Sequence, residues 1–232
     1  MPNKKVILCI PGLGGYEKVF SPYEQFLPDY KLIHVGLTNI NKAETDMEQV
    51  IKENGSVIVL ANCYGVQSIL RLYERLPAGS IEKLIVIEPF FAEFYWWRQL
   101  AYVVNGGILK LLTLARKLGL YRRSFDLSLK YPDLPKRYPL AIQPLFDISN
   151  QSLIDYFTKI EDILSFKLPR SISIPTFFIL SPGGYMKDRE KRKALLKHFE
   201  QVEVTETGKR THDIVAASVP KVAKAVAGWL SS

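Results

Sequence analysis

The sequence predicts an α/β protein, in which a doubly wound, mostly parallel sheet of about six strands carries a helical insertion. Three observations favour this fold class. The strand candidates are continuous apolar runs, as in a parallel sheet that is covered on both faces. Segments with helical periodicity separate them in the alternating order of βαβ units. One long stretch, residues 91–170, lacks the strand rhythm and interrupts the alternation.

The strand and helix candidates alternate along both ends of the chain. The predicted strands are Lys5–Ile10, Leu32–Leu37, Val57–Leu60, Leu84–Ile87, Thr176–Leu180 and Val202–Thr205. The predicted helices between and after them are Glu17–Leu27, Ala43–Glu53, Val66–Leu76, Asp188–Phe199 and Ile214–Leu230. The last of these contains Pro220, which predicts that the helix is interrupted or begins there.

The insertion is predicted to be a helical cap, residues 91–170, on a core formed by residues 1–90 and 171–232. Trp96–Leu118 is apolar at helical spacing, and Ser152–Leu164 forms a second helical piece. Because the cap follows a central strand directly, we expect it to roof whatever lies at the end of that strand.

Composition bounds the setting of the protein. A chain of 232 residues with 47% hydrophobic and 23% charged residues suits a globular protein with a sizeable core. Its two cysteines favour a reducing compartment. The first apolar run, Val6–Ile10, is too short for a signal peptide, and no stretch reaches the roughly 18 apolar residues of a membrane span. We expect a cytoplasmic protein that is able to touch membranes peripherally.

Positive charge is concentrated in the cap. Between residues 96 and 137, nine basic residues stand against two acidic ones, a net +7 within a chain of net charge +8. One interpretation is a solvated helix face. The other is a binding surface for an acidic carrier protein, for CoA or for an anionic membrane surface. Nucleic acid is disfavoured, because no stacking motif or recognition-helix pattern accompanies the charge.

The segment from Val57 to Leu70 (VIVLANCYGVQSIL) runs from a strand into a helix without a gap. Ligands of parallel sheets bind at the carboxyl ends of the strands, where the winding reverses. A nucleophile on so sharp a corner is strained, and the residues two before and two after it must be small. Ala61 and Gly65 satisfy that demand around Cys63. The alternative is that Cys63 is an inert core cysteine.

Three motifs resemble the α/β-hydrolase family. The residues Ala61 to Gly65 (ANCYG) stand where its nucleophile elbow is usually G-x-S-x-G, and Pro11 to Gly15 (PGLGG) match its oxyanion loop after the first core strand. His212 follows the last strand, where the family has its catalytic histidine. The resemblance covers the chain apart from the cap, which stands where the family places its lid.

The resemblance implies a role for each matching residue. Cys63 is the nucleophile, and His212 is the general base and then the acid. The backbone N–H groups of Leu13 and Tyr64 form the oxyanion hole. The small residues that shape the elbow and the loop are Gly12, Gly14, Ala61 and Gly65.

A cysteine nucleophile is similar to that of dienelactone hydrolases and polyhydroxyalkanoate synthases. A nearby histidine and a helix N-terminus readily convert a thiol into a thiolate. The implied activity is therefore acyl processing of an apolar ester or thioester by a hydrolase, thioesterase or acyltransferase. A thioester intermediate passes its acyl group to water or to a second nucleophile.

The sequence leaves open which residue is the acid of the triad. The family usually places it about four residues after the fifth strand, but this chain has Ser181 to Tyr185 (SPGGY) there and its first carboxylate at Asp188. Glu88, just past the fourth strand, is equally suitable. A Cys–His dyad without an acid is the third alternative.

The sequence also bears on functions of other classes. A dinucleotide site needs a glycine where the chain has Glu17, and no cluster shows metal-ligand spacing, so neither cofactor nor metal is expected. The alternative functions are a non-catalytic binding or scaffold protein of this fold, or a cyclising or carbon–carbon bond enzyme.

Overall fold

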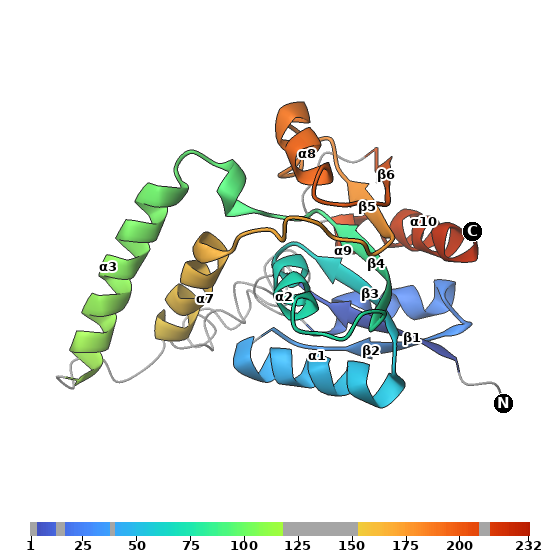
Figure 1. Ribbon diagram of the computed structural model, residues 1–232, viewed down its shortest axis with the longest axis horizontal. Coiled ribbons are helices and arrows are strands. Elements are labelled where there is room, and N and C mark those ends of the chain that lie inside the picture. The colour runs from blue at the N-terminus through green and yellow to red at the C-terminus, as the bar shows by residue number, and fades with distance from the viewer. Residues whose placement is uncertain (1–3, 13–16, 38–39, 118–152, 209–213) are drawn as a thin grey trace, which may run out of the picture. The chain divides into compact units, whose positions relative to one another are not determined.

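Six strands form one all-parallel sheet in the computed structural model, which describes residues 4–12, 17–37, 40–117, 153–208 and 214–232 (Figure 1). The strands are β1 (Lys5–Ile10), β2 (Tyr30–His34), β3 (Val57–Asn62), β4 (Ile81–Ile87), β5 (Thr176–Leu180) and β6 (Val202–Glu206). Their order across the sheet is β2-β1-β3-β4-β5-β6. The predicted doubly wound parallel sheet is therefore confirmed.

The winding reverses between β1 and β3. From β1 the chain moves outward to β2 and then returns to place β3 on the other side of β1, where Ile10 lies opposite Ala61. Every later strand adds beyond β3. The carboxyl ends of β1 and β3 therefore flank the crevice where parallel α/β sheets bind their ligands.

The edge strand β2 differs most from its prediction. It spans Tyr30–His34, whereas the apolar run predicted Leu32–Leu37. Its pairing with β1 begins at Tyr30 opposite Lys5, and Val35 N–H donates to the Cys9 carbonyl oxygen just after the strand (3.1 Å). Because an edge strand is only half-buried, its apolar pattern marks its bounds poorly.

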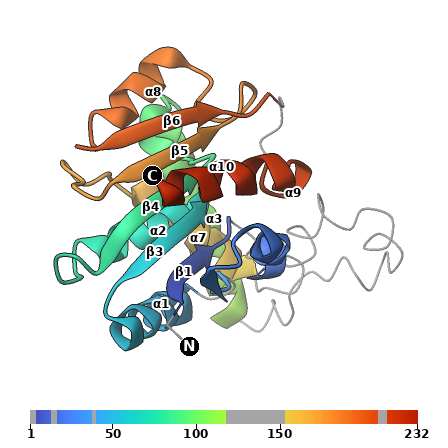
Figure 2. The same ribbon diagram turned by 90° about the vertical axis from the view of Figure 1, so that its right-hand side faces the viewer.

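Helices cover both faces of the sheet (Figure 2). The 3₁₀ helix η1 (Glu17–Phe26), α9 (Ile214–Ala217) and α10 (Val219–Ser231) pack in one core cluster with alternate residues of the strands. On the other face lie α1 (Ile40–Asn54), α2 (Tyr64–Tyr73) and α8 (Arg189–Leu196). The predicted final helix is interrupted at Ser218, two residues before Pro220.

The internal contacts divide the chain into two compact units. Met1–Phe90 with Leu168–Ser232 holds the sheet and its helices, and Phe91–Lys167 is the second unit. The second unit contains η2 (Ala92–Phe94), α3 (Arg98–Lys117) and α7 (Leu153–Ser165). None of the described helices is long and apolar enough to cross a membrane.

Tyr23 joins two helices, η1 and α9, on the same face of the sheet, and we predict that this hydrogen bond stabilises the fold. Its buried hydroxyl donates to the Val215 carbonyl oxygen in α9 (3.0 Å). Tyr23→Phe removes the donor and leaves a buried carbonyl, so the free energy of unfolding should fall by about 1 kcal/mol. Urea denaturation followed by circular dichroism measures this, and an unchanged midpoint would contradict it.

Candidate active site

Cys63 forms the corner between β3 and α2. It has φ 50° and ψ −115°, a conformation that costs a non-glycine residue about 1–3 kcal/mol. Two backbone bonds hold it there. Cys63 N–H donates to the Ile87 carbonyl oxygen at the end of β4 (3.0 Å), and Val66 N–H donates to the Cys63 carbonyl oxygen (3.3 Å). The predicted strained corner is therefore present, and it is joined to the neighbouring strand end.

Two small residues flank Cys63, and Gly65 is the one that allows α2 to approach β1. Ala61 is fully buried between Ile10 of β1 and Val86 of β4. A Cβ atom at Gly65 would lie 2.7 Å from the Ile10 carbonyl oxygen and would also collide with that of Pro11. No side chain fits at position 65 without moving the backbone of β1. The glycine of the motif is therefore sterically required.

The loop after β1 lies against the corner. A Cβ atom at Gly12 would be 3.2 Å from Cys63 Cβ, so the glycine allows the loop to pass close to the nucleophile candidate. The predicted proximity of the loop and the corner holds at Gly12. Leu13 and Gly14 lie outside the described residues, and the oxyanion role of Leu13 stays a prediction.

Tyr64 is the first residue of α2, a helix of ten residues. The N–H groups of a first turn have no acceptor within their own helix, and the helix dipole favours negative charge at that end. Cys63 therefore lies at a helix end where negative charge is favoured. The Tyr64 side chain itself is buried.

Glu88 is the second strained residue at this edge of the sheet. Cys63 and Glu88 are the non-glycine residues with positive φ in the described parts of the chain, and Glu88 has φ 45°. Its carboxylate is 1% exposed and accepts a short hydrogen bond from Ser181 N–H, at the end of β5. Any side chain at Gly184 would collide with this carboxylate. A buried carboxylate is thus held between the ends of β4 and β5.

Asp188 has a different place. It is exposed and is the N-cap of α8, where its Oδ1 accepts from Glu190 N–H (2.9 Å) and from Lys191 N–H (3.2 Å). These bonds satisfy the first turn of the helix. The geometry gives Asp188 a structural role and gives Glu88 the buried position among the strand ends.

His212 lies outside the described residues, but the chain on its N-terminal side is anchored near Glu88 and the chain on its C-terminal side is anchored in the core. Thr207 N–H donates to the Leu180 carbonyl oxygen (2.8 Å), next to the Ser181 amide that binds Glu88. On the other side, Ile214 and its successor in α9 are fully buried in the core. The segment that carries His212 therefore begins at the carboxyl end of β5.

The two cysteines differ in environment. Cys63 is partly exposed, whereas Cys9 is fully buried in β1. Burial raises the pKa of the Cys9 thiol, and the negative charge of Glu24 raises it further. Cys9 is therefore an unreactive internal reference for Cys63.

Sequence reasoning missed Gln67, one turn after Cys63 on α2. Its side chain is fully buried, and its Nε2 donates to the Phe90 carbonyl oxygen. Its Oε1 accepts no hydrogen bond from the described residues. The Phe90 ring in turn packs against Tyr185 (4.7 Å between centroids). The available signal was one glutamine in an otherwise apolar helix start.

Solved structures share this architecture over almost the whole chain. An epoxide hydrolase from Bacillus megaterium is 14% identical with a TM-score of 0.68, covering 98% of this chain and 94% of that one. An α/β-hydrolase enzyme from a Medee basin deep-sea metagenome library is 15% identical (TM-score 0.67; 100% and 91%). The type II thioesterase BorB from the borrelidin biosynthetic cluster is 13% identical (TM-score 0.62; 100% and 93%).

These likenesses are structural. No protein-family model matches the sequence, and no curated protein matches it. The all-parallel six-stranded sheet and the likeness to solved hydrolases together show that the chain has the α/β-hydrolase fold.

Proposed function

We propose that the protein is an acyl-processing enzyme that attacks an apolar ester or thioester through a covalent acyl-Cys63 intermediate. The observation that carries the proposal is the positive φ of Cys63 at the head of α2, with a partly exposed thiol. Strained non-glycine residues concentrate at functional sites. The fold, shared with structures named epoxide hydrolase and thioesterase, supports a hydrolytic or acyl-processing activity.

The proposed reaction has two halves. In the first, the Cys63 sulfur attacks the acyl carbonyl carbon while its proton passes to His212. The carbonyl oxygen becomes an oxyanion, which the N–H groups of Tyr64 and Leu13 stabilise. The bond to the alcohol or thiol leaving group then breaks, and the leaving group takes the proton from His212.

In the second half, His212 takes a proton from water, which attacks the thioester carbon. The C–S bond breaks, the sulfur takes that proton back from His212 to restore the thiol, and a carboxylic acid leaves. An amine, thiol or alcohol in place of water gives acyl transfer by the same steps. His212 and Leu13 keep the roles that the family resemblance implies.

We assign the orienting carboxylate to Glu88. Its carboxylate is buried and bound to Ser181 N–H, beside the strand end that anchors the segment before His212. Asp188 already caps α8 through two backbone N–H groups and is exposed. The buried site also excludes water, which strengthens a carboxylate–imidazole bond.

We predict that alkylation separates the two cysteines. Iodoacetamide should modify Cys63 in the native protein and leave Cys9 unmodified, because Cys9 is fully buried and burial raises its pKa. An acyl thioester substrate should slow the reaction at Cys63. Peptide mapping by mass spectrometry measures both sites. Equal labelling of the two cysteines, or none at Cys63, would oppose the proposal.

The choice of acid is tested by two matched substitutions. Glu88→Gln should lower kcat/KM for a nitrophenyl acyl ester by about 100-fold or more, because the charge that stabilises the imidazolium is lost. Asp188→Ala should leave kcat/KM unchanged and lower the free energy of unfolding by about 1 kcal/mol through the lost cap. A loss of activity in Asp188→Ala but not in Glu88→Gln would assign the orienting role to Asp188. Unchanged activity in both variants would indicate a Cys63–His212 dyad without an acid.

A further inference from the structure

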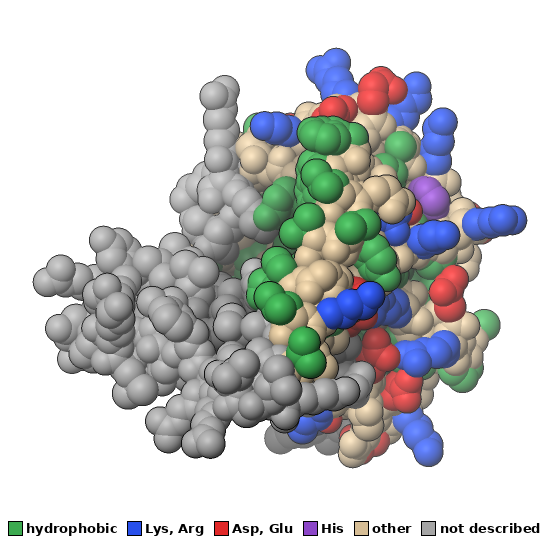
Figure 3. All heavy atoms as spheres, turned by 90° about the vertical axis from the view of Figure 1, so that its left-hand side faces the viewer, with side chains coloured by type: hydrophobic (Ala, Val, Ile, Leu, Met, Phe, Trp, Pro, Cys, Tyr) green, Lys and Arg blue, Asp and Glu red, His purple; other side chains and the backbone are tan. Residues whose placement is uncertain are grey.

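The helix α3 exposes a long apolar face, the α3 stripe, on the second unit (Figure 3). The stripe consists of Leu100, Val103, Val104, Ile108, Leu111 and Leu114. Successive members lie three or four residues apart, except for the adjacent pair Val103 and Val104, so they follow one side of the helix. Leu100, Val103 and Leu111 are 65%, 70% and 67% exposed. Contiguous exposed apolar side chains, in contrast to scattered ones, mark interaction sites.

The opposite side of α3 contacts α7. Asn105 Nδ2 donates to the Phe157 carbonyl oxygen (2.9 Å), and Arg98 Nε donates to that of Leu164 (2.6 Å). These pairs run in opposite directions along the two helices, so α3 and α7 pack antiparallel within the unit. The α3 stripe therefore lies on the side of α3 that faces away from these contacts with α7. A Cβ atom at Gly107, between the apolar residues, would meet no atom within 4 Å.

Charge indicates what kind of partner fits. The sequence of α3 contains four basic residues and no acidic one, and residues 96–137 carry a net +7. Lys110 is exposed beside the apolar residues. A second copy of the chain would place the same positive charge against itself, which disfavours a symmetric dimer through this face. A negatively charged partner is complementary.

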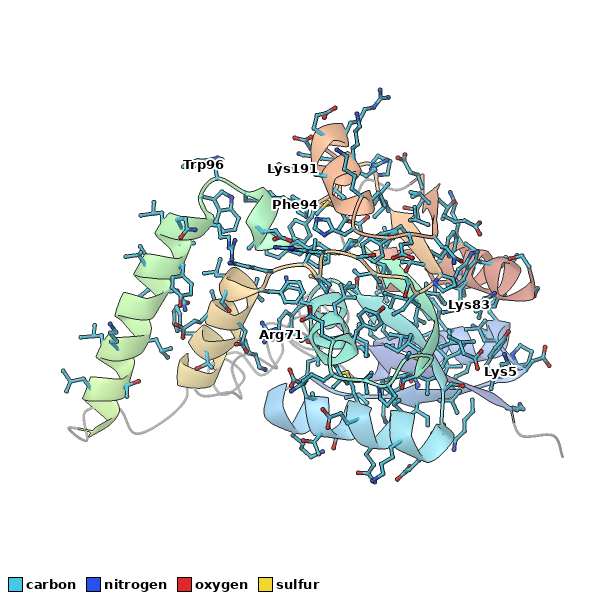
Figure 4. The ribbon with its side chains drawn as sticks, in the orientation of Figure 1. Lys5, Arg71, Lys83, Phe94, Trp96 and Lys191 are labelled. Atoms are coloured by element: carbon cyan, nitrogen blue, oxygen red, sulfur yellow. The ribbon has the colours of Figure 1, made fainter. Side chains whose placement is uncertain are left out.

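The shape of the surface distinguishes a membrane from an acidic protein. A helix of 20 residues is about 30 Å long, and its apolar residues form one uninterrupted line. A lipid interface accepts such a line in its plane, with basic side chains at the headgroups. Trp96, at the N-terminal end of α3 (Figure 4), is 89% exposed, and tryptophan is favoured at the interface. We infer that the α3 stripe docks on an anionic membrane surface.

Vesicle sedimentation tests the inference with the full chain. The protein should partition onto phosphatidylcholine vesicles that contain phosphatidylserine, and far less onto phosphatidylcholine alone. Added salt should weaken the binding. Tryptophan emission should shift to the blue on binding. Absence of binding to the anionic vesicles, or equal binding to both compositions, would overturn the inference.

Matched variants locate the surface. The double substitution Leu100→Gln with Leu111→Gln should lower the partition constant by about tenfold or more, because two apolar side chains no longer enter the interface. The control is Val202→Gln with Val204→Gln, which changes two exposed apolar residues on β6. Circular dichroism verifies that both proteins are folded. An equal loss in the control would overturn the assignment to α3.

Charge reversal supplies the second control. Lys110→Glu should weaken binding about fivefold or more, and Lys193→Glu, the same charge change on exposed α8, should not. A dimer in light scattering that dissociates in the Leu100/Leu111 variant would contradict the inference and favour self-association. Cys63→Ala should bind vesicles like the unaltered protein, because the inference does not rest on the proposed chemistry.

Discussion

The contact of α2 with the carboxyl end of β1 is the constraint on which the site depends. Gly65 lies so close to the carbonyl oxygen of Ile10 that no side chain fits, and this brings the first turn of α2 directly over the reversal point of the sheet. The chain then has a single residue, Cys63, in which to change from strand to helix. The strain at that residue is offset by the fully buried helix start and the bond to Ile87.

The same edge of the sheet holds a second strained residue, and the two are connected. Glu88 follows Ile87, whose carbonyl oxygen accepts from Cys63 N–H. Its carboxylate accepts a hydrogen bond from Ser181 N–H, and it occupies the space that any side chain at Gly184 would enter. Burying a carboxylate is costly unless it is hydrogen-bonded or charge-paired. The Ser181 amide supplies such a hydrogen bond to the buried Glu88 carboxylate.

Much of this arrangement was predictable from local sequence. Apolar runs located the four central strands β1, β3, β4 and β5, since buried parallel strands have no alternation to confuse them. The corner at Cys63 was predictable because a sharp strand-to-helix turn requires small residues two positions before and two positions after it. This requirement is visible within five consecutive residues. The bounds of β2 were less predictable, because an edge strand is only half-buried. The 3₁₀ form of η1, with Pro22 inside it, also escaped the periodicity.

The parts that could not be predicted depend on residues far apart in the chain. Glu88 and Asp188 were indistinguishable by sequence position, and only the Ser181 amide and the α8 cap separate their environments. Gln67 is recognised only through its bond to Phe90, which lies 23 residues away. Such tertiary contacts leave no local periodicity. The Leu13 and His212 assignments still rest on resemblance.

The most direct measurement of the central claim is the mass of the intact protein during turnover. With a nitrophenyl acyl ester and rapid acid quenching, we predict one added acyl group, mapped to the peptide that contains Cys63. Hydroxylamine should remove it, as expected of a thioester, and Cys63→Ala should never acquire it. Sustained turnover without an adduct, or an adduct on another residue, would contradict the account.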